Sequence, residues 1–206
     1  MKKNKVILTI VFIAFFTLPA FSDIIDTLIS PMPMSTSSMP MREFNIKIGI
    51  DFDGNYHTDK YIEDIDGKKF DVGNNASFAA EYIKYFNPYI GAGAGISYQI
   101  PRELDGFHGK FGFAPLYASL KIRSWPQEPG IYAYIACQAG YNLFYGDCEL
   151  KPKEGGFYYG IGLGIVYKEF LIEVMRGVNS AIAQDMSKNK INMDYDKFTV
   201  SVGYKF

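Results

Sequence analysis

The 206-residue chain contains few of the residues on which many functional classes depend. It has only two cysteines, Cys137 and Cys148, and only two histidines, so a disulfide-stapled fold and a histidine-rich site are not indicated. Its formal net charge of −1 gives no electrostatic basis for binding nucleic acid. After residue 22, no apolar run reaches the roughly 20 residues that a transmembrane helix needs. We expect two free thiols, because Cys137 falls within a predicted strand and Cys148 within a predicted loop.

The first 22 residues have the three-part layout of a secretory signal peptide. Three lysines within the first five residues precede an apolar run over 6–18, and small residues follow at Ala20 and Ser22. A membrane anchor is the alternative, but the apolar run is shorter than the roughly 20 residues of a spanning helix. We predict cleavage before Asp23. The remaining chain carries 18 basic and 22 acidic residues, a net charge of about −4.

Residues 23–42 have the composition of a tether rather than of a folded element. This segment contains three prolines, four methionines and four serines and shows no sustained period. The chain therefore divides into a signal peptide over 1–22, a flexible periplasmic segment over 23–42 and a folded domain over 43–206.

The last ten residues, KFTVSVGYKF, alternate strictly between apolar side chains and polar or small ones. A period of two is that of a β-strand with one apolar face. The same alternation recurs in seven earlier segments. These segments are 44–52, 76–84, 89–100, 116–123, 131–142, 158–168 and 170–175.

The connections between these eight segments alternate in length. The short ones are 85–88, 125–130 and 168–169. The longer polar ones are approximately 53–71, 101–110, 146–156 and 183–194. This alternation is typical of an up-and-down meander, and the even number of strands places both termini at the short-turn end.

The composition of the two strand faces predicts where the protein resides. Charged residues and glycines share one face, whereas Ile, Phe and Tyr occupy the other, and aromatic residues make up 17% of the chain. A soluble lipocalin-like barrel would have its apolar face inward. Here the glycines share the face of the charged residues, and such small residues suit the crowded interior of a narrow barrel, so the charged face is predicted to point inward. We therefore predict an all-β fold, an eight-stranded antiparallel up-and-down transmembrane β-barrel with its apolar face toward lipid.

With its signal peptide, eight alternating strands and a final VSVGYKF, the chain resembles the small outer-membrane β-barrels of the OmpA/OmpX type over about residues 43–206. In that family the terminal strand typically ends in Phe and serves as the sorting signal read by the barrel-assembly machinery. The residues that match this pattern are Val200, Val202, Tyr204 and Phe206. The resemblance implies the outer membrane of a Gram-negative cell, with lipid and lipopolysaccharide as neighbours. It is a weak guide to activity, because this scaffold hosts several functions.

Inward-facing charges are predicted to meet inside the barrel. Four of them lie about three residues into their strands from the short-turn end, and Asp51 lies higher. Because an unpaired buried charge is costly, we expect these groups to form ion pairs. The predicted lumen charge network comprises Lys47, Asp51, Glu81, Lys121, Arg123 and Glu173. It could act as a plug or gate, but a structural staple is the favoured reading.

Arg176 does not fit the alternation of its strand. Continued from Ile172 and Val174, the pattern points Arg176 toward lipid, where an arginine at the midplane costs about 2–4 kcal/mol. Either the strand bulges near RGVNS or Arg176 lies at the level of the outer headgroups.

Other motifs give little support for further chemistry. The runs GAGAG and GIGLG repeat on one strand face, whereas a phosphate loop needs a strand-to-helix turn, so nucleotide binding is not expected. The carboxylate-rich loop 53–71 could bind calcium or bridge divalent cations to lipopolysaccharide, but its glycine spacing is not that of an EF-hand, and a solvated loop is favoured. His57 and His108 lack a neighbouring serine with which to form a nucleophile–base pair. We expect no catalytic residues, no metal and no cofactor.

Three functions remain open at this level. The favoured one is a non-enzymatic outer-membrane barrel with a structural or surface-interaction role, which could contact an extracellular ligand through its four loops. The first alternative is a narrow porin-like pore for small solutes or ions. The second is an enzyme that modifies lipid A.

Overall fold

The computed structural model describes residues 41–58, 70–72, 74–104, 107–124, 130–148, 151–184 and 190–206, and every regular element among them is a β-strand. The segments predicted as signal peptide and tether lie outside these residues, except for the last two of the tether. No helix in the described part of the chain is long and apolar enough to cross a membrane. The strands are β1 Arg42–Thr58, β2 Phe70–Val72, β3 Asn75–Tyr85, β4 Ile90–Gln99, β5 Arg102–Leu104, β6 Phe107–Arg123, β7 Ile131–Cys148, β8 Lys151–Tyr167, β9 Phe170–Gln184 and β10 Lys190–Lys205.

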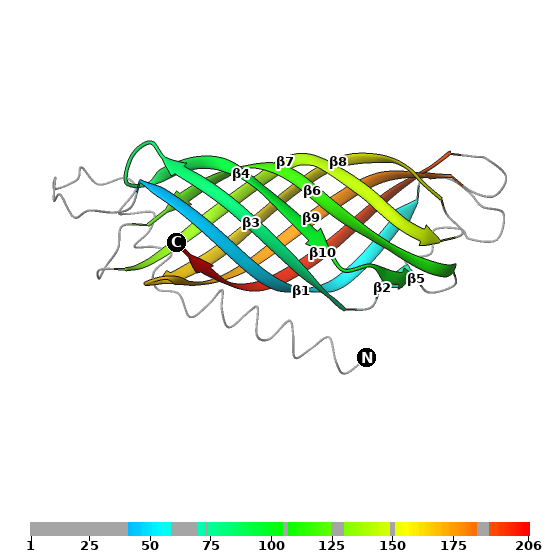
Figure 1. The fold of residues 1–206 in the computed structure, drawn as a ribbon, viewed down its shortest axis with the longest axis horizontal. Coiled ribbons are helices and arrows are strands. Elements are labelled where there is room, and N and C mark those ends of the chain that lie inside the picture. Colours follow the sequence, from blue (N-terminus) through cyan, green and yellow to red (C-terminus); the bar gives the residue numbers. More distant parts are fainter. Residues whose placement is uncertain are drawn as a thin grey trace. The chain divides into compact units, whose positions relative to one another are not determined.

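Eight of these strands form the wall of a closed antiparallel barrel (Figure 1). Their order is β1, β3, β4, β6, β7, β8, β9 and β10, each paired with the next, and β10 pairs with β1. The seam runs from the Asn45–Lys205 pair to the Thr58–Met193 pair. Beyond it the Phe206 amide donates to the Phe44 carbonyl at 2.8 Å. Closure leaves no strand edge unpaired in the lipid, as a bilayer requires.

The two short strands continue the wall beyond the ends of β3 and β4. Strand β2 pairs with β1 and β5, and β5 pairs with β6. The wall passes from the β3–β4 pair to the β2–β5 pair at Asn75. There the Asn75 side-chain amide donates to the carbonyls of Ile100 and Pro101 at 3.0 and 3.2 Å. These short strands were not predicted, because the polar segments 53–71 and 101–110 were expected to be loops.

The long strands extend further than the alternation indicated. Strand β7 runs to Cys148 and β8 starts at Lys151, and β9 and β10 also extend into residues expected to be loop, 183–194. A bilayer needs only about 9–11 tilted residues, so strands of 15–18 residues also form wall outside the apolar band. There both faces can meet water, the hydrophobic alternation fades, and the sequence pattern no longer distinguishes strand from loop.

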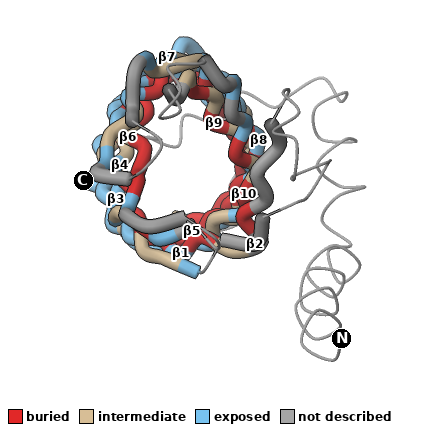
Figure 2. The backbone as a smooth tube through the Cα atoms, turned by 90° about the vertical axis from the view of Figure 1, so that its right-hand side faces the viewer, coloured by how far each residue is buried: buried red, intermediate tan, exposed pale blue. Residues whose placement is uncertain are grey.

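The faces of the barrel are oriented as the sequence predicted. Large apolar side chains on the outer face, such as Ile46, Val202 and Phe206, are 36–67% exposed. Among the inward residues, Lys47 is 3% and Glu81 is 1% exposed. Figure 2 shows the buried positions on the inner side of the ring of strands and the exposed ones on the outer side. A lipocalin-like barrel has the reverse arrangement and is excluded.

Glycines inside the barrel make room for inward tyrosine rings. A Cβ built at Gly95 would lie 2.6 Å from the ring of Tyr117, and one at Gly164 would lie 2.3 Å from the ring of Tyr134. Because real Cβ contacts are never this short, larger residues at these positions would displace the rings. The period-two glycines of β4 and β8 thus act in packing.

Arg176 faces outward with no bulge in its own strand. The register of β9 with β10 is continuous past it, and the nearest irregularity in its other pairing is an extra residue in β8, between Gly155 and Tyr158. The guanidinium donates to both carboxylate oxygens of Asp196, at 3.2 and 2.6 Å, and lies 5.8 Å from the ring centroid of Phe198. The predicted bulge of β9 near RGVNS is therefore wrong. The other explanation, that Arg176 lies at the level of the outer headgroups, remains a prediction.

Arg176→Leu should change the free energy of unfolding in lipid vesicles by less than about 1 kcal/mol. An arginine costs about 2–4 kcal/mol at the midplane but only about 0–1 near the interface, so its removal from the headgroup level gains little. The measurement is equilibrium unfolding in urea, with Ile172→Ala as a control for general effects on the outer face of β9. A gain of several kcal/mol would place Arg176 deep in the hydrocarbon.

Candidate functional site in the barrel lumen

Buried ionic groups occupy the lumen at three depths, and the lower cluster lies at the short-turn end. Glu43, at the start of β1, accepts hydrogen bonds from Arg123 at 3.0 Å, from the Tyr132 hydroxyl at 2.5 Å and from the Tyr85 hydroxyl at 3.1 Å. Arg123 also donates to the Pro88 carbonyl at 2.7 Å, and its guanidinium lies 3.5 Å from the ring centroid of Tyr85. The cluster joins β1 to β6 across the lumen, although the two strands are not neighbours.

The middle cluster is a chain of alternating charges. Lys47 on β1 donates to Glu173 on β9 at 2.7 Å and lies 3.8 Å from Glu81 on β3. Lys121 on β6 donates to Glu81 at 2.7 Å. The Tyr134 hydroxyl donates to Glu173 at 2.8 Å, and the Lys121 ammonium lies 4.6 Å from the Tyr134 ring centroid. All four charged side chains are at most 4% exposed.

Two further side chains complete the middle cluster. The Gln138 amide donates to Glu81 at 3.2 Å, and its oxygen accepts a hydrogen bond from the Tyr158 hydroxyl at 2.7 Å. Strands β1, β3, β6, β7, β8 and β9 thus contribute to one network of charge-assisted bonds, which satisfies the buried charges that a lumen free of bulk water would otherwise penalise.

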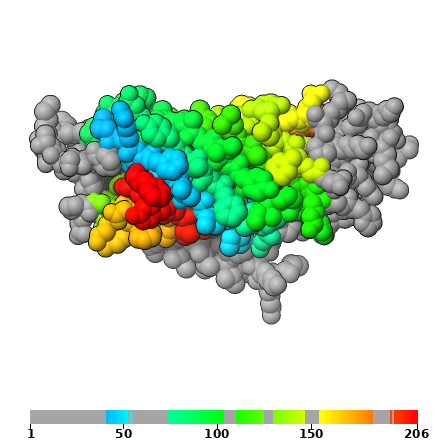
Figure 3. Space-filling model, in the orientation of Figure 1, coloured from blue at the N-terminus to red at the C-terminus, as the bar shows by residue number. Residues whose placement is uncertain are grey.

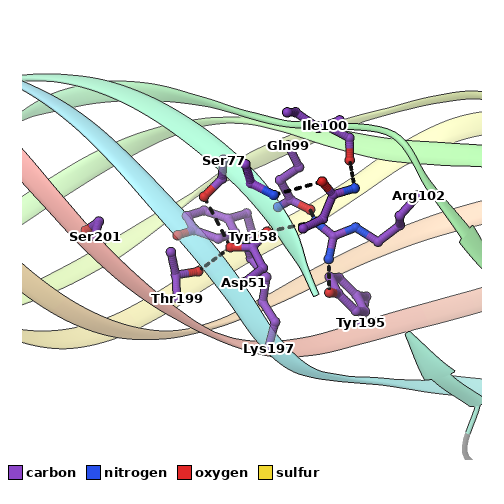
Figure 4. Close-up of polar contacts among 12 residues, drawn as sticks. Asp51, Ser77, Gln99, Ile100, Arg102, Tyr158, Tyr195, Lys197, Thr199 and Ser201 are labelled. Carbon is purple, nitrogen blue, oxygen red and sulfur yellow. Dashed lines mark hydrogen bonds and ion pairs between the residues drawn. The ribbon is translucent and has the colours of Figure 1, made fainter. Parts of the chain in front are cut away.

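The upper cluster surrounds one carboxylate, that of Asp51 (Figure 4). Arg102 on β5 donates to it at 2.7 Å, and the ammonium of Lys197 on β10 lies 2.8 Å from it. The Thr199 and Ser77 hydroxyls donate to the same carboxylate at 2.7 and 3.2 Å. The Asp51 side chain is fully buried, and the two basic side chains are 3% and 7% exposed.

Aromatic rings lie on the long-loop side of the upper cluster. Arg102 donates to the Tyr195 hydroxyl through its second terminal nitrogen, and the two residues are drawn in contact in Figure 4. The Tyr195 ring stacks on Phe113 at 5.8 Å between centroids, and Phe113 stacks on Phe144 at 5.1 Å. Both Tyr195 and Phe113 are at most 1% exposed, so the lumen at this level is filled by side chains.

Between the middle and upper clusters lies a small cavity of about 50 Å³. On this measure one water takes about 10–15 Å³, so the space holds about three or four waters. Its lining includes Lys47, Ser77, Gln99, Tyr117, Gln138, Tyr158, Glu173, Lys197, Thr199 and Ser201.

The structure places the six predicted lumen residues inside the barrel but in three groups. Lys47, Glu81, Lys121 and Glu173 come together at one depth, whereas Asp51 belongs to the upper cluster and Arg123 to the lower one. The structure thus brings together the four residues expected at one depth and places Asp51 and Arg123 in separate clusters. Their sharing of one barrel interior follows from the strand period alone.

Three charged partners were missed by the sequence reasoning. Glu43 and Lys197 lie on the inward parity of their strands, so the alternation could have found them. Arg102 could not be found in this way, because the inward parity of β4 is broken at Ile100 and Pro101, before β5 begins.

The four residues of the predicted assembly signal lie on the outer face at the end of β10. Val200, Val202, Tyr204 and Phe206 are 39–67% exposed. The Phe206 ring packs 4.8 Å from Tyr204 and 6.0 Å from Phe44, between centroids. Figure 3 shows this end of the chain beside β1 at the barrel surface.

Several other candidate residues have side chains outside the described part of the structure. These are Cys148, His57, His108 and most of the acidic segment 53–71. Cys137 is a free thiol exposed on the outer face of β7. Among the described residues, no group of three or more His, Cys, Asp or Glu side chains could hold a metal ion.

Together the closed wall, the apolar exterior and the charged interior define a transmembrane β-barrel of the outer-membrane type. The chain is similar to Ail, the attachment invasion locus protein of Yersinia pestis, with 18% identity, 80% of this chain and 98% of Ail covered, and a TM-score of 0.48. It is also similar to OprG from Pseudomonas aeruginosa, with 15% identity, 80% and 95% covered, and a TM-score of 0.49. No protein-family model and no curated protein matches the sequence.

Proposed function

We propose that the protein is a non-enzymatic outer-membrane barrel that supports the cell envelope and displays its long-loop end at the cell surface. The observation that carries this proposal is the series of three ionic clusters, which tie non-neighbouring strands together through the lumen. We expect such clusters to stiffen the wall and to obstruct the lumen at three depths. Each of their four buried carboxylates lies within 3.0 Å of a buried base, as a structural staple requires.

The length of the strands supports the display role. Strand β7 has 18 residues, which span about 60 Å along the strand and about 45 Å along the barrel axis at a typical tilt. The apolar band of an outer-membrane barrel is only about 25 Å tall. The excess places ordered wall beyond the lipid, where it can contact lipopolysaccharide or an extracellular ligand.

Conductance across a planar bilayer tests the closed lumen. We expect the refolded wild-type barrel to give no stable openings. A variant with Lys47, Glu81, Lys121 and Glu173 all replaced by alanine should also give none, because the lower cluster and the aromatic rings beside the upper cluster still occupy the lumen at other depths. Glu103→Ala, which removes an exposed charge, serves as the control.

Stable wild-type openings that disappear when the middle cluster is neutralised would contradict a structural role. They would instead establish the alternative of a narrow pore whose lumen charges attract the permeating ion.

A further inference from the structure

The buried charges of the described part of the lumen do not balance. Among the described residues, nine charged side chains are buried inside the barrel, five of them basic and four acidic. The lower cluster pairs Glu43 with Arg123, and the middle cluster holds two bases and two acids. Among the described residues, the excess positive charge therefore belongs to the upper cluster, where the Asp51 carboxylate faces both Arg102 and Lys197.

The Asp51 carboxylate has no capacity left to offset this excess. One oxygen accepts from the Thr199 and Ser77 hydroxyls and lies 2.8 Å from the Lys197 ammonium, and the other accepts from Arg102. Four donors thus converge on this single carboxylate, three of them on one oxygen. One negative charge is thus shared between two buried cations, and desolvating the second cation is costly without a further anion.

Unused hydrogen-bond donors lie beside the same cluster. The Gln99 amide nitrogen and the Arg102 Nε are buried and have no hydrogen-bond partner among the described residues. Gln99 and Lys197 both line the cavity of about 50 Å³, together with the Ser77 and Thr199 hydroxyls. The space next to the excess charge is therefore rich in donors, which is the environment that an anion needs.

We propose that this cavity binds one small inorganic monovalent anion, such as chloride, between Lys197 and the Gln99 amide. The anion restores the charge balance of the upper cluster and gives the unpaired Gln99 donor a partner. A cation is disfavoured by the sign of the excess charge. A large organic anion such as gluconate exceeds a space of about three or four waters, and a doubly charged phosphate would exceed the single excess charge.

Thermal unfolding of the barrel, refolded from urea separately in each salt, tests the proposal. Sodium chloride and sodium bromide are compared with sodium gluconate at equal ionic strength, because gluconate is too large for the cavity. We expect the melting temperature to be higher in either halide by about 5 °C and to saturate with halide concentration, as ligand binding to the folded state predicts.

Lys197→Met removes the excess charge, and its melting temperature should be the same in halide and gluconate. Lys205→Met is the matched control, because Lys205 is a partly buried lysine at the other end of β10, 5.2 Å from the ring centroid of Tyr132. This control should keep the wild-type response to halide. Equal wild-type melting in the three salts, or a halide response that survives in Lys197→Met, would overturn the proposal.

If Lys197→Met does not refold, Gln99→Leu and crystals grown in bromide decide the question. Gln99→Leu should reduce the halide shift, and anomalous diffraction from wild-type crystals should place bromide in the cavity near the Gln99 amide. A cavity that contains only water in those crystals would overturn the proposal, because it would mean that Lys197 is neutral or is balanced by another carboxylate of the chain. This result is independent of the conductance experiment, which tests whether the lumen is open.

Discussion

Glu81→Ala should lower the free energy of unfolding by about 3–5 kcal/mol, the loss expected when one partner of a buried ion pair is removed. The substitution leaves the Lys121 ammonium buried without its carboxylate partner at 2.7 Å and removes one of the two acids near Lys47. It also removes the acceptor of the Gln138 amide. Lys47 keeps Glu173 at 2.7 Å, so Lys121 should account for most of the loss.

Equilibrium unfolding in urea, followed by circular dichroism and by gel mobility of unheated samples, measures this loss. Glu103→Ala is the matched control, because Glu103 pairs with Lys110 at 3.7 Å on the exposed surface and its removal should cost less than about 1 kcal/mol. The double variant Glu81→Met/Lys121→Met should recover most of the lost stability, since it removes both members of the buried pair. Equal losses for Glu81→Ala and Glu103→Ala would show that water screens the middle cluster.

The strand period predicts the direction of each side chain far better than its partner. Alternation alone places Lys47, Glu81, Lys121 and Glu173 inside the barrel at a common depth. It cannot show that Lys47 lies closer to Glu173 than to Glu81, because that choice depends on the curvature of the wall and on the reach of each side chain. Depth is a property of one strand, whereas pairing is a property of the closed ring.

Prediction from the sequence fails where the surroundings of the wall change. Within the bilayer, lipid on one side and a packed lumen on the other enforce a period of two. Above the apolar band both faces can be polar, so the ends of β7 and β8 resemble loop. At Ile100 and Pro101 the wall passes from β4 to β5, and Arg102 enters the lumen with a parity that the preceding strand does not predict.

Phe206→Ala should reduce the amount of folded barrel in the outer membrane of cells severalfold, because we propose that the end of β10 is read by the barrel-assembly machinery. The same variant should refold into detergent almost as well as the wild type. The backbone bonds between Phe206 and Phe44 that close the seam do not depend on the ring. The ring is 67% exposed, so its truncation leaves no cavity within the barrel.

Phe170→Ala separates recognition of the terminal strand from a general need for aromatic rings at this end of the barrel. Phe170 is 62% exposed, and its ring packs 5.5 Å from that of Tyr204, but it opens β9 rather than ending the chain. We expect Phe170→Ala to reach the outer membrane at near wild-type levels, as measured by fractionation and gel mobility of unheated samples. Equal losses in cells for both variants would refute an assembly signal, and poor refolding of Phe206→Ala alone would assign its ring to barrel closure instead.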